Sequence, residues 1–418
     1  MKYAIVIPEG AADAPLAELE GCTPLVAAHT PTMDGLSREG RLGTAVLTPE
    51  GRDCTDDVTL MNLLGYDTLR YPLGCAPVEA AGRDLALPPE RWATRLSMVT
   101  VRNERLVDHR AGGIGQAETA ALLKDLAFAL HKELGDDVRG MRLVPASGHR
   151  AFLIDDAGRS FSSLITHPPT LLLNKPIRKH LPEGEPGELM GSIIRISASC
   201  FEGHPVNGAR IDAALEPATH LWPWGPGCGI DPAKSIPAFA DRYDGLRGLM
   251  ICSDDVPAGL AKLIGWDLKR VEDDEDYRGK GELAAGALDD YDIVCVHAES
   301  PDEAGHRGDL EGKIDALAAI DKHIIAPLAD RLEASSRWRL LVAPTHYTNT
   351  TTRCHHDAAA PFMMVGDRVE ALLREPYTEA NAKAADLHIE AGDELMEYFL
   401  FGSGIRRRRT KRHAQPRR

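Results

Sequence analysis

Acidic and histidine side chains gather in the ten residues SPDEAGHRGD, numbers 300 to 309, shortly after the apolar run DIVCV at 292–296. In open α/β sheets, ligands bind at the carboxyl ends of the strands, and carboxylates and imidazoles there are typical ligands of divalent metal ions. Asp302 and His306 are four residues apart, and Pro301 suits the first turn of a helix, so both side chains should share one helix face. The stretch therefore predicts a metal site.

Two further apolar runs end in residues of the same kind. VIP is followed by Glu9, while LLVAP is followed by Thr345 and His346 and then by the run HHD at 355–357. Taken singly, a histidine or an acid after a strand is more often a satisfied or solvated loop residue. Because three strand ends carry such residues, the metal interpretation is favoured.

The elements that would position these residues follow an α/β pattern. Apolar runs at 3–8 and 41–47, with a helical pattern between them, suit a βαβ crossover. Later apolar runs at 248–253, 292–298, 338–343 and 361–366 alternate with segments at 258–271 and 310–332 that we expect to be amphipathic helices.

The middle of the chain has a different pattern. It contains one clear helix at 117–134, a strand candidate at 149–155 and a passage rich in proline and glycine. A change of composition between two α/β halves predicts an inserted domain. We expect a discontinuous core of residues 1–107 and 246–402, an inserted domain of residues 108–245 and a basic, disordered tail of residues 403–418.

Charge and composition exclude several classes of protein. The chain has 418 residues and a net charge of −15, although its last fourteen residues hold eight Lys and Arg and no acid. An acidic body makes nucleic acid an improbable partner. No apolar run approaches 18 residues, and MKYAIVIPEG is too short in its apolar part for a signal peptide. Eight scattered cysteines without a CxxC pair indicate reduced thiols, so we expect a cytoplasmic protein with no membrane partner.

Several motifs resemble one known family along nearly the whole chain, from residue 1 to about 400. They are VIPEGAADAPL, TPLVAAHTPTMDGL, LLGYD, APVEAAG, DEAGHRGD, HPVNGAR and LWPWGPG. Together they are similar to the archaeal-type cofactor-independent phosphoglycerate mutases of the alkaline phosphatase superfamily. The resemblance implies an α/β fold with an alkaline-phosphatase-like parallel-sheet core and an inserted α/β cap domain. It also implies divalent metal ions, Mn or Zn and possibly Mg, and a small phosphorylated metabolite as partner.

The resemblance also assigns metal ligands. Asp302, His306 and His355 match the ligands of one ion. At the other ion, Glu9 stands where the family has an aspartate, and Thr345-His346 stands where the family has an Asp-His pair. Losing one charged ligand should weaken this second site, so we expect one or two ions per chain.

The nucleophile is the largest departure from the family. The family carries a phosphoryl group on a serine, but this chain reads CTDDV, and the ungapped match to that serine is Asp56. A shift of one residue places Thr55 there instead. Thr55 has the same hydroxyl chemistry, Asp56 could form an acyl phosphate, and a third possibility is that the nucleophile has been lost.

Positions that face the substrate are partly retained. His149, Arg150 and Arg210 match substrate-binding positions of the family, whereas Cys75 replaces an arginine and Thr170 begins a pair that replaces His-Asp. The expected function is metal-dependent phosphoryl transfer that converts 3-phosphoglycerate to 2-phosphoglycerate in glycolysis and gluconeogenesis. The alternatives are a divergent non-catalytic or regulatory relative, and a phosphotransferase or phosphatase with another substrate.

Overall fold

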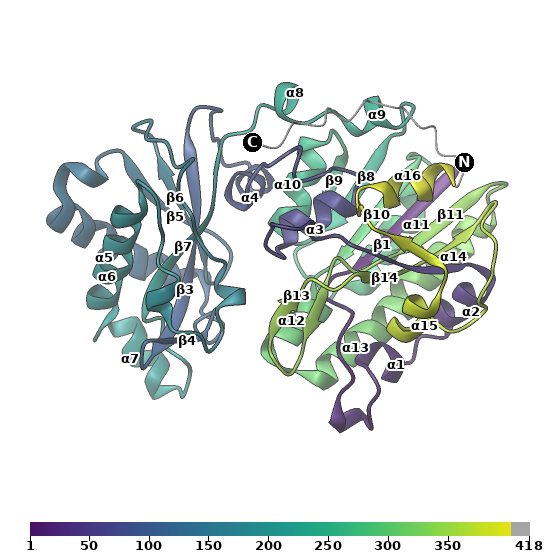
Figure 1. The fold of residues 1–418 in the computed structure, drawn as a ribbon, viewed down its shortest axis with the longest axis horizontal. Helices are drawn as coiled ribbons and strands as arrows, with labels where there is room; N and C mark the ends of the chain where they lie inside the picture. The colour runs from purple at the N-terminus through teal and green to yellow at the C-terminus, as the bar shows by residue number, and fades with distance from the viewer. Residues whose placement is uncertain (403–418) are drawn as a thin grey trace, which may run out of the picture.

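The computed structural model describes residues 1–402, so the predicted tail at 403–418 lies outside the described residues. Within residues 1–402 the larger of two main sheets has eight strands in the order β15-β2-β14-β11-β1-β10-β8-β9 (Figure 1). Their bounds are β1 (Lys2–Pro8), β2 (Arg41–Ala45), β8 (Gly248–Cys252), β9 (Asp267–Arg270), β10 (Ile293–Ala298), β11 (Trp338–Val342), β14 (Ala360–Gly366) and β15 (Leu387–Ile389).

The centre of this sheet is parallel. β1 lies between β10 and β11 and pairs with both in parallel register, whereas β14 is antiparallel to β11 and β2. Nearly every residue of β1, β10 and β11 is buried, which explains why these strands read as continuous apolar runs. Because the three strands run the same way, the segments that follow them meet at one edge of the sheet. The predicted parallel α/β core is confirmed.

Helices cover both faces of the larger sheet. Buried side chains of α3, α4, α10 and α16 pack on one face, and those of α1, α2, α11, α13 and α14 pack on the other. The bounds are α1 (Pro24–Ala27), α2 (Pro31–Glu39), α3 (Asp56–Leu63), α4 (Cys75–Gly82), α10 (Asp255–Leu263), α11 (Tyr277–Ala287), α12 (Ser300–Arg307), α13 (Leu310–Ile320), α14 (Ala326–Glu333), α15 (Glu379–Ala384) and α16 (Glu394–Phe401).

Residues from the middle of the chain form a second sheet, drawn on the left of Figure 1. Its strands run in the order β4-β3-β6-β5, with β7 on the other side of β3. The bounds are β3 (Trp92–Arg102), β4 (Arg105–Asp108), β5 (Met141–Pro145), β6 (Arg150–Asp155), β7 (His220–Cys228), α5 (Gln116–Leu134), α6 (Gly187–Phe201), α7 (Pro205–Asp212), α8 (Pro232–Ser235) and α9 (Phe239–Arg242). Since β3 pairs with β6 and β7, we propose an insertion that begins near residue 92 and ends near 228 rather than at 108 and 245.

Two predicted helices differ from the structure. The segment at 258–271 is helical only to Leu263, because Gly265, with φ +77°, ends it and the edge strand β9 follows. The segment at 310–332 is helical but is interrupted by a π-helical turn at Asp321–Ile325. No helix within residues 1–402 combines the length and apolarity needed to cross a bilayer.

Candidate metal-binding active site

Three predicted ligands converge at the start of α12. Pro301 lies in its first turn, and the helix places Asp302 Oδ2 3.2 Å from His306 Nε2. His355 arrives from the short hairpin of β12 (Tyr347–Asn349) and β13 (Cys354–His356), with its Nε2 3.3 Å from Asp302 Oδ1 and 2.9 Å from His306 Nε2. All three side chains are buried or nearly so.

The two histidines of this group are oriented by the backbone. His306 Nδ1 lies 2.9 Å from the carbonyl oxygen of Arg353, and His355 Nδ1 lies 3.1 Å from that of Cys54. A carbonyl oxygen only accepts, so Nδ1 carries the proton in each ring and Nε2 is left as the inward-facing donor atom. Two imidazole nitrogens and a carboxylate that face one another fit a divalent ion.

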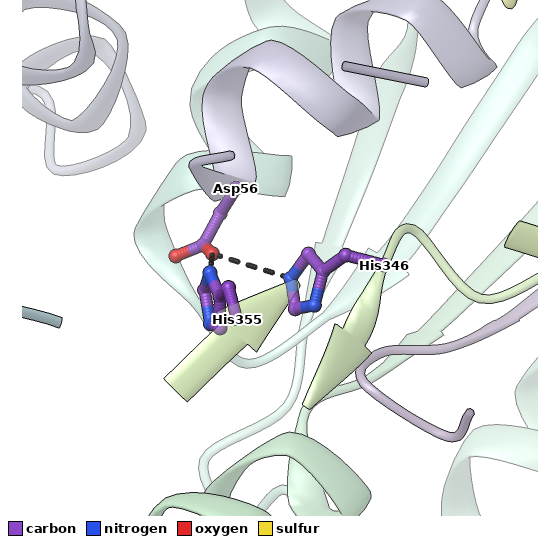
Figure 2. A group of neighbouring side chains, drawn as sticks. All are labelled: Asp56, His346 and His355. Atoms are coloured by element: carbon purple, nitrogen blue, oxygen red, sulfur yellow. Dashed lines mark ion pairs between the residues drawn. The ribbon is translucent and has the colours of Figure 1, made fainter. Parts of the chain in front are cut away.

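A second group lies beside the first, at the start of α3 (Figure 2). Asp56 is the first residue of that helix, and its Oδ1 is 3.5 Å from His346 Nε2 and 3.9 Å from His355 Nδ1. The rings of His346 and His355 stack with centroids 3.9 Å apart. Asp56 Oδ1 and His346 Nε2 are buried and have no hydrogen-bond partner within residues 1–402, as expected of atoms that face an ion.

Glu9 and Thr345 border this second group. Glu9 Oε1 is 4.0 Å from His346 Nε2 and 3.4 Å from the Thr345 hydroxyl, which can donate to it. Its other oxygen lies 3.0 Å from Nε2 of His297, a fully buried residue of β10. The longer side chain of Glu9 therefore reaches toward β10, and Thr345 supplies no charge. The second group has a smaller and looser donor set than the first.

Burial and neighbouring charges set the protonation of these groups. Burial opposes ionisation of Asp302, but the adjacent imidazoles outweigh it and hold the Asp302 pKa well below its usual range. Burial also lowers the pKa of His355, yet the Asp302 carboxylate raises it to about 9. Burial, with Asp56 and Asp302 nearby, raises the pKa of Glu9 well above its usual value. In the metal-free protein, these raised pKa values favour the protonated forms of His355 and Glu9.

One hydroxyl joins the two groups. Thr348 Oγ1 donates to Asp302 Oδ1 and lies 3.2 Å from His346 Nδ1. The backbone after β1 approaches this point so closely that a Cβ on Gly10 would lie 2.5 Å from Thr348 Oγ1 and 2.6 Å from Asp302 Oδ1. Gly10 also has φ +62°, so glycine is required here for both reasons.

Three arginines face the centre, each backed by a carboxylate. Arg150 contacts Asp254 and Glu299 at 2.5 and 3.0 Å. Arg110 pairs with Glu303, and Arg95 Nε lies 3.2 Å from Glu79. Arg95 also donates to the Cys75 sulfur at 3.2 Å, so a guanidinium lies beside the position at which the resemblance leads one to expect an arginine.

These side chains enclose a cavity of about 30 Å³. It is lined by Thr55, Asp56, Arg95, Ser97, His109, Arg110, His149, Arg150, Pro169, Thr170, Trp224, Asp302, His306 and His355. A wider cavity of about 580 Å³ adjoins it and shares Thr55 and Trp224. The inner cavity has room for only one small chemical group of a ligand, and the wider cavity has room for the remainder of a small metabolite. Guanidinium groups and candidate metal ligands thus face the same space.

Most of the predicted site residues meet at this point. Thr55, Asp56, His149 and Arg150 line the inner cavity with the three ligands of the first group, and Glu9 and His346 border it. Arg210 does not line it. Its guanidinium donates to Glu118 and to the carbonyl oxygens of Ala111, Gly112 and Glu216. Arg210 therefore holds the loop that carries Arg110 and does not line the cavity.

Arg110 and Asp254 were missed by the sequence analysis. Asp254 follows the apolar strand β8 at the same edge as Glu9 and Asp302, so the rule that found those residues could have found it. Arg110 follows β4 in the loop DHRAGG, where Ala111, Gly112 and Gly113 all have positive φ. That run of small residues indicates a turn, but no sequence pattern places the turn beside the metal ligands.

Comparison with known proteins gives a consistent result. The family model described as 2,3-bisphosphoglycerate-independent phosphoglycerate mutase matches residues 37–207. Curated relatives of that name include one from Methanothrix thermoacetophila, 34% identical over 96% of this chain and 100% of the relative. Another, from Methanothermobacter thermautotrophicus, is 36% identical over 96% of this chain and 97% of its own length.

Solved structures support the fold. A cofactor-independent phosphoglycerate mutase from Thermoplasma acidophilum has a TM-score of 0.54 at 22% identity, with 96% of this chain and 99% of that chain covered. A protein from Pyrococcus horikoshii has a TM-score of 0.70 at 22% identity, with 96% of both chains covered. The long sequence matches and the shared fold agree with the donor geometry at the strand ends, and the chain belongs to the 2,3-bisphosphoglycerate-independent phosphoglycerate mutase family.

Proposed function

We propose that this chain is a metal-dependent phosphoryl-transfer enzyme that interconverts 3-phosphoglycerate and 2-phosphoglycerate. The observation that carries the proposal is the meeting of Asp302, His306 and His355 with the start of α3 inside one cavity that is also lined by three arginines. Asp302, His306 and His355 would hold one Mn²⁺ or Zn²⁺ ion, and Glu9, Asp56 and His346 a second. Such ions neutralise phosphoryl charge and lower the pKa of a nucleophile.

The arginines suit the substrate's anionic groups. Arg110 and Arg150 can reach phosphate or carboxylate oxygens while their backing carboxylates fix the orientation of each guanidinium. The inner cavity of about 30 Å³ leaves little space for water, which would limit hydrolysis of a phosphoenzyme. We also propose a cytoplasmic location, supported by the free state of all eight cysteines, which lie within the described residues.

The phosphoryl acceptor we propose is Asp56. One carboxylate oxygen attacks phosphorus, the bond from phosphorus to the 3-oxygen of glycerate breaks, and that oxygen takes up a proton. The 2-hydroxyl then attacks phosphorus, gives up its proton and releases the carboxylate, so that overall one proton moves from the 2-oxygen to the 3-oxygen. Asp56 is favoured because its Oδ1 faces His346 and His355 and has no hydrogen-bond partner within the described residues. Burial opposes its ionisation, but His346 and His355 lower the Asp56 pKa, so it is a carboxylate at neutral pH.

The first test is a coupled assay of mutase activity on metal-loaded protein, with Asp302→Ala as the blank. The second is quenching during turnover, followed by hydroxylamine. A hydroxylamine-labile phosphoenzyme that is absent in Asp56→Asn supports Asp56, whereas a hydroxylamine-stable one that is absent in Thr55→Val assigns Thr55 instead. The absence of turnover in folded, metal-loaded protein would contradict the proposal.

A second candidate function is a relative that binds the ion and a phosphorylated metabolite without transferring phosphate. It is favoured by the carboxylate at position 56 and by the uncharged Thr345 beside Glu9. The double variant Asp56→Ser, Thr345→Asp separates the two candidates. If only the double variant has mutase activity, the non-catalytic function is supported; if it is less active than the unmodified chain, Asp56 is the working acceptor.

A further inference from the structure

A pocket lined by arginines lies at the edge of the larger sheet opposite the metal centre. The metal ligands follow the carboxyl ends of β1, β10 and β11, whereas Arg339 is the second residue of β11 and Arg41 is the first residue of β2. The pairings make β1, β11 and β2 run in the same direction, so both arginines lie at the amino ends. The pocket has a volume of about 160 Å³.

The strand register places the two arginines on one face. Arg339 pairs with Gly366 of β14, and Arg41 pairs with Met364 of the same strand. Residues two apart on a strand share a face, so Arg339 and Arg41 flank β14 on the side that α16 covers, with Cα atoms about 12 Å apart. Gly366 lies close against β11, where a Cβ would lie 2.3 Å from the carbonyl oxygen of Trp338.

Arg339 is a buried cation without an acidic partner. Its side chain is 4% exposed, and its Nε and Nη1 donate only to the carbonyl oxygens of Asp367 and Phe399, at 2.8 and 2.6 Å. Within residues 1–402 it forms no ion pair, and its Nη2 makes no hydrogen bond. That nitrogen lies 3.6 Å from the place a Cβ on Gly402 would occupy, and Gly402 lines the pocket. Buried cations are normally paired with an acid, so the space beside the Arg339 guanidinium is suited to an anion.

The neighbouring side chains add positive charge. Arg41 uses Nη2 to pair with Asp386 at 2.8 Å, but its Nε is buried and has no hydrogen-bond partner in the described part of the chain. Arg368 is a third guanidinium in the lining, and Glu370 is the one carboxylate among the described lining residues. The hydroxyl of Tyr398, also in the lining, can donate to an anion.

We propose that this pocket binds a small dianion, either inorganic phosphate or the phosphate group of a metabolite, between Arg339, Arg41 and Arg368. Guanidinium groups match the oxygens of such an anion and bind it with charge-assisted hydrogen bonds. A volume of about 160 Å³ is several times that of a water molecule, at roughly 30 Å³, so phosphate fits with room for a few more atoms. The pocket is separate from the catalytic cavity and independent of the proposed mutase activity.

The test is calorimetric titration of the full chain with inorganic phosphate and, separately, with 3-phosphoglycerate. Asp302→Ala is used as background, so that anion binding at the metal centre is reduced. We expect the double variant Arg41→Gln, Arg368→Gln to bind phosphate at least tenfold more weakly than this background, while the same double change in the otherwise unmodified chain leaves metal content and catalytic rate unchanged. Tighter binding of 3-phosphoglycerate than of phosphate identifies a metabolite as the ligand, and equal binding identifies the free anion.

Arg337→Gln is the matched control, since Arg337 is exposed, pairs with Asp367 and does not line the pocket. Equal loss of phosphate binding in this control would mean that general surface charge, and not the pocket, attracts the anion. Unchanged binding in the double variant would also overturn the proposal. Thermal melting of each variant, including the single variant Arg368→Gln, checks that a loss of phosphate binding is not caused by unfolding.

Discussion

The proposed metal centre has two halves at the same edge of one sheet: the first group of Asp302, His306 and His355, and the second group of Glu9, Asp56 and His346. They differ in how completely they are built. In the first half, three donors face one another within 3.3 Å, and both histidines are held by backbone carbonyls. In the second half, His346 is 3.5 and 4.0 Å from its acidic neighbours, and Thr345 contributes a hydroxyl instead of a charge. A site keeps its ion only where each donor is oriented as well as present, so the first half should bind more tightly.

The largest expected effect comes from removing the central ligand of the first half. Asp302→Ala deletes the carboxylate that both His306 and His355 face, and we expect metal affinity to fall by at least about 100-fold. Titration with Mn²⁺ and metal analysis after dialysis measure the change. Glu311→Gln, which alters an exposed acid on the following helix, is the control. If Asp302→Ala retained both ions, the expectation that the first half binds metal more tightly than the second would be wrong.

The next effect is a dependence of metal binding on pH. Burial favours neutral His355, but Asp302 raises its pKa to about 9, so in the metal-free protein an ion must displace a proton from it. Apparent affinity should rise about tenfold per pH unit from pH 6.5 to 9 and then level off. Titrations in buffers of different ionisation enthalpy should show about one proton released per ion.

The same group affects the stability of the metal-free protein. Because the folded pKa of His355 lies above its unfolded value, its contribution to stability is complete below about pH 6.5 and is lost as the pH rises through 9. Chemical denaturation at several pH values after metal removal measures this. A metal affinity that stays flat from pH 6.5 to 9 would contradict both expectations.

A smaller effect should follow from separating the two halves. Thr348→Val removes the hydroxyl that contacts Asp302 and His346, while the side-chain volume is nearly retained. We expect about a tenfold loss of affinity in both halves, since the variant changes the orientation of ligands and not their number. Equilibrium dialysis measures the ions bound. Thr351→Val, an exposed change in the same hairpin loop, should have no effect, and a loss confined to one half would show that the halves are independent.

The most localised effect is expected in the second half alone. Asp56→Ala removes one of its ligands, and we expect at least about a tenfold loss of affinity for the weaker ion and no change at the stronger one. Competition between Mn²⁺ and a chromogenic chelator resolves the two binding steps. A large loss at the stronger ion would show that Asp56 belongs to the first half.

Much of the candidate site could be predicted from the sequence, because residues that follow the carboxyl end of a strand can be recognised from a short segment alone. Glu9, Asp302 and His346 each lie within four residues of the end of a buried strand, and the parallel sheet brings such ends together. Arg210 was assigned to the substrate from its motif, but it bonds to backbone carbonyls behind the Arg110 loop. A guanidinium has the same chemistry in both places, so local sequence cannot separate them.

The sequence by itself determined the α/β architecture and the chemical types gathered at the metal edge, because apolar periodicity and strand-end residues are properties of single segments. Only the tertiary structure decided which donors face one another. Asp302 and His355 are brought within 3.3 Å from segments far apart in the chain, and Asp56 is turned toward His346 and His355 by the start of α3. Likewise, the arginine pocket exists because β2 and β11 flank one strand. These distances follow from strand register and helix packing, which are set by the whole core.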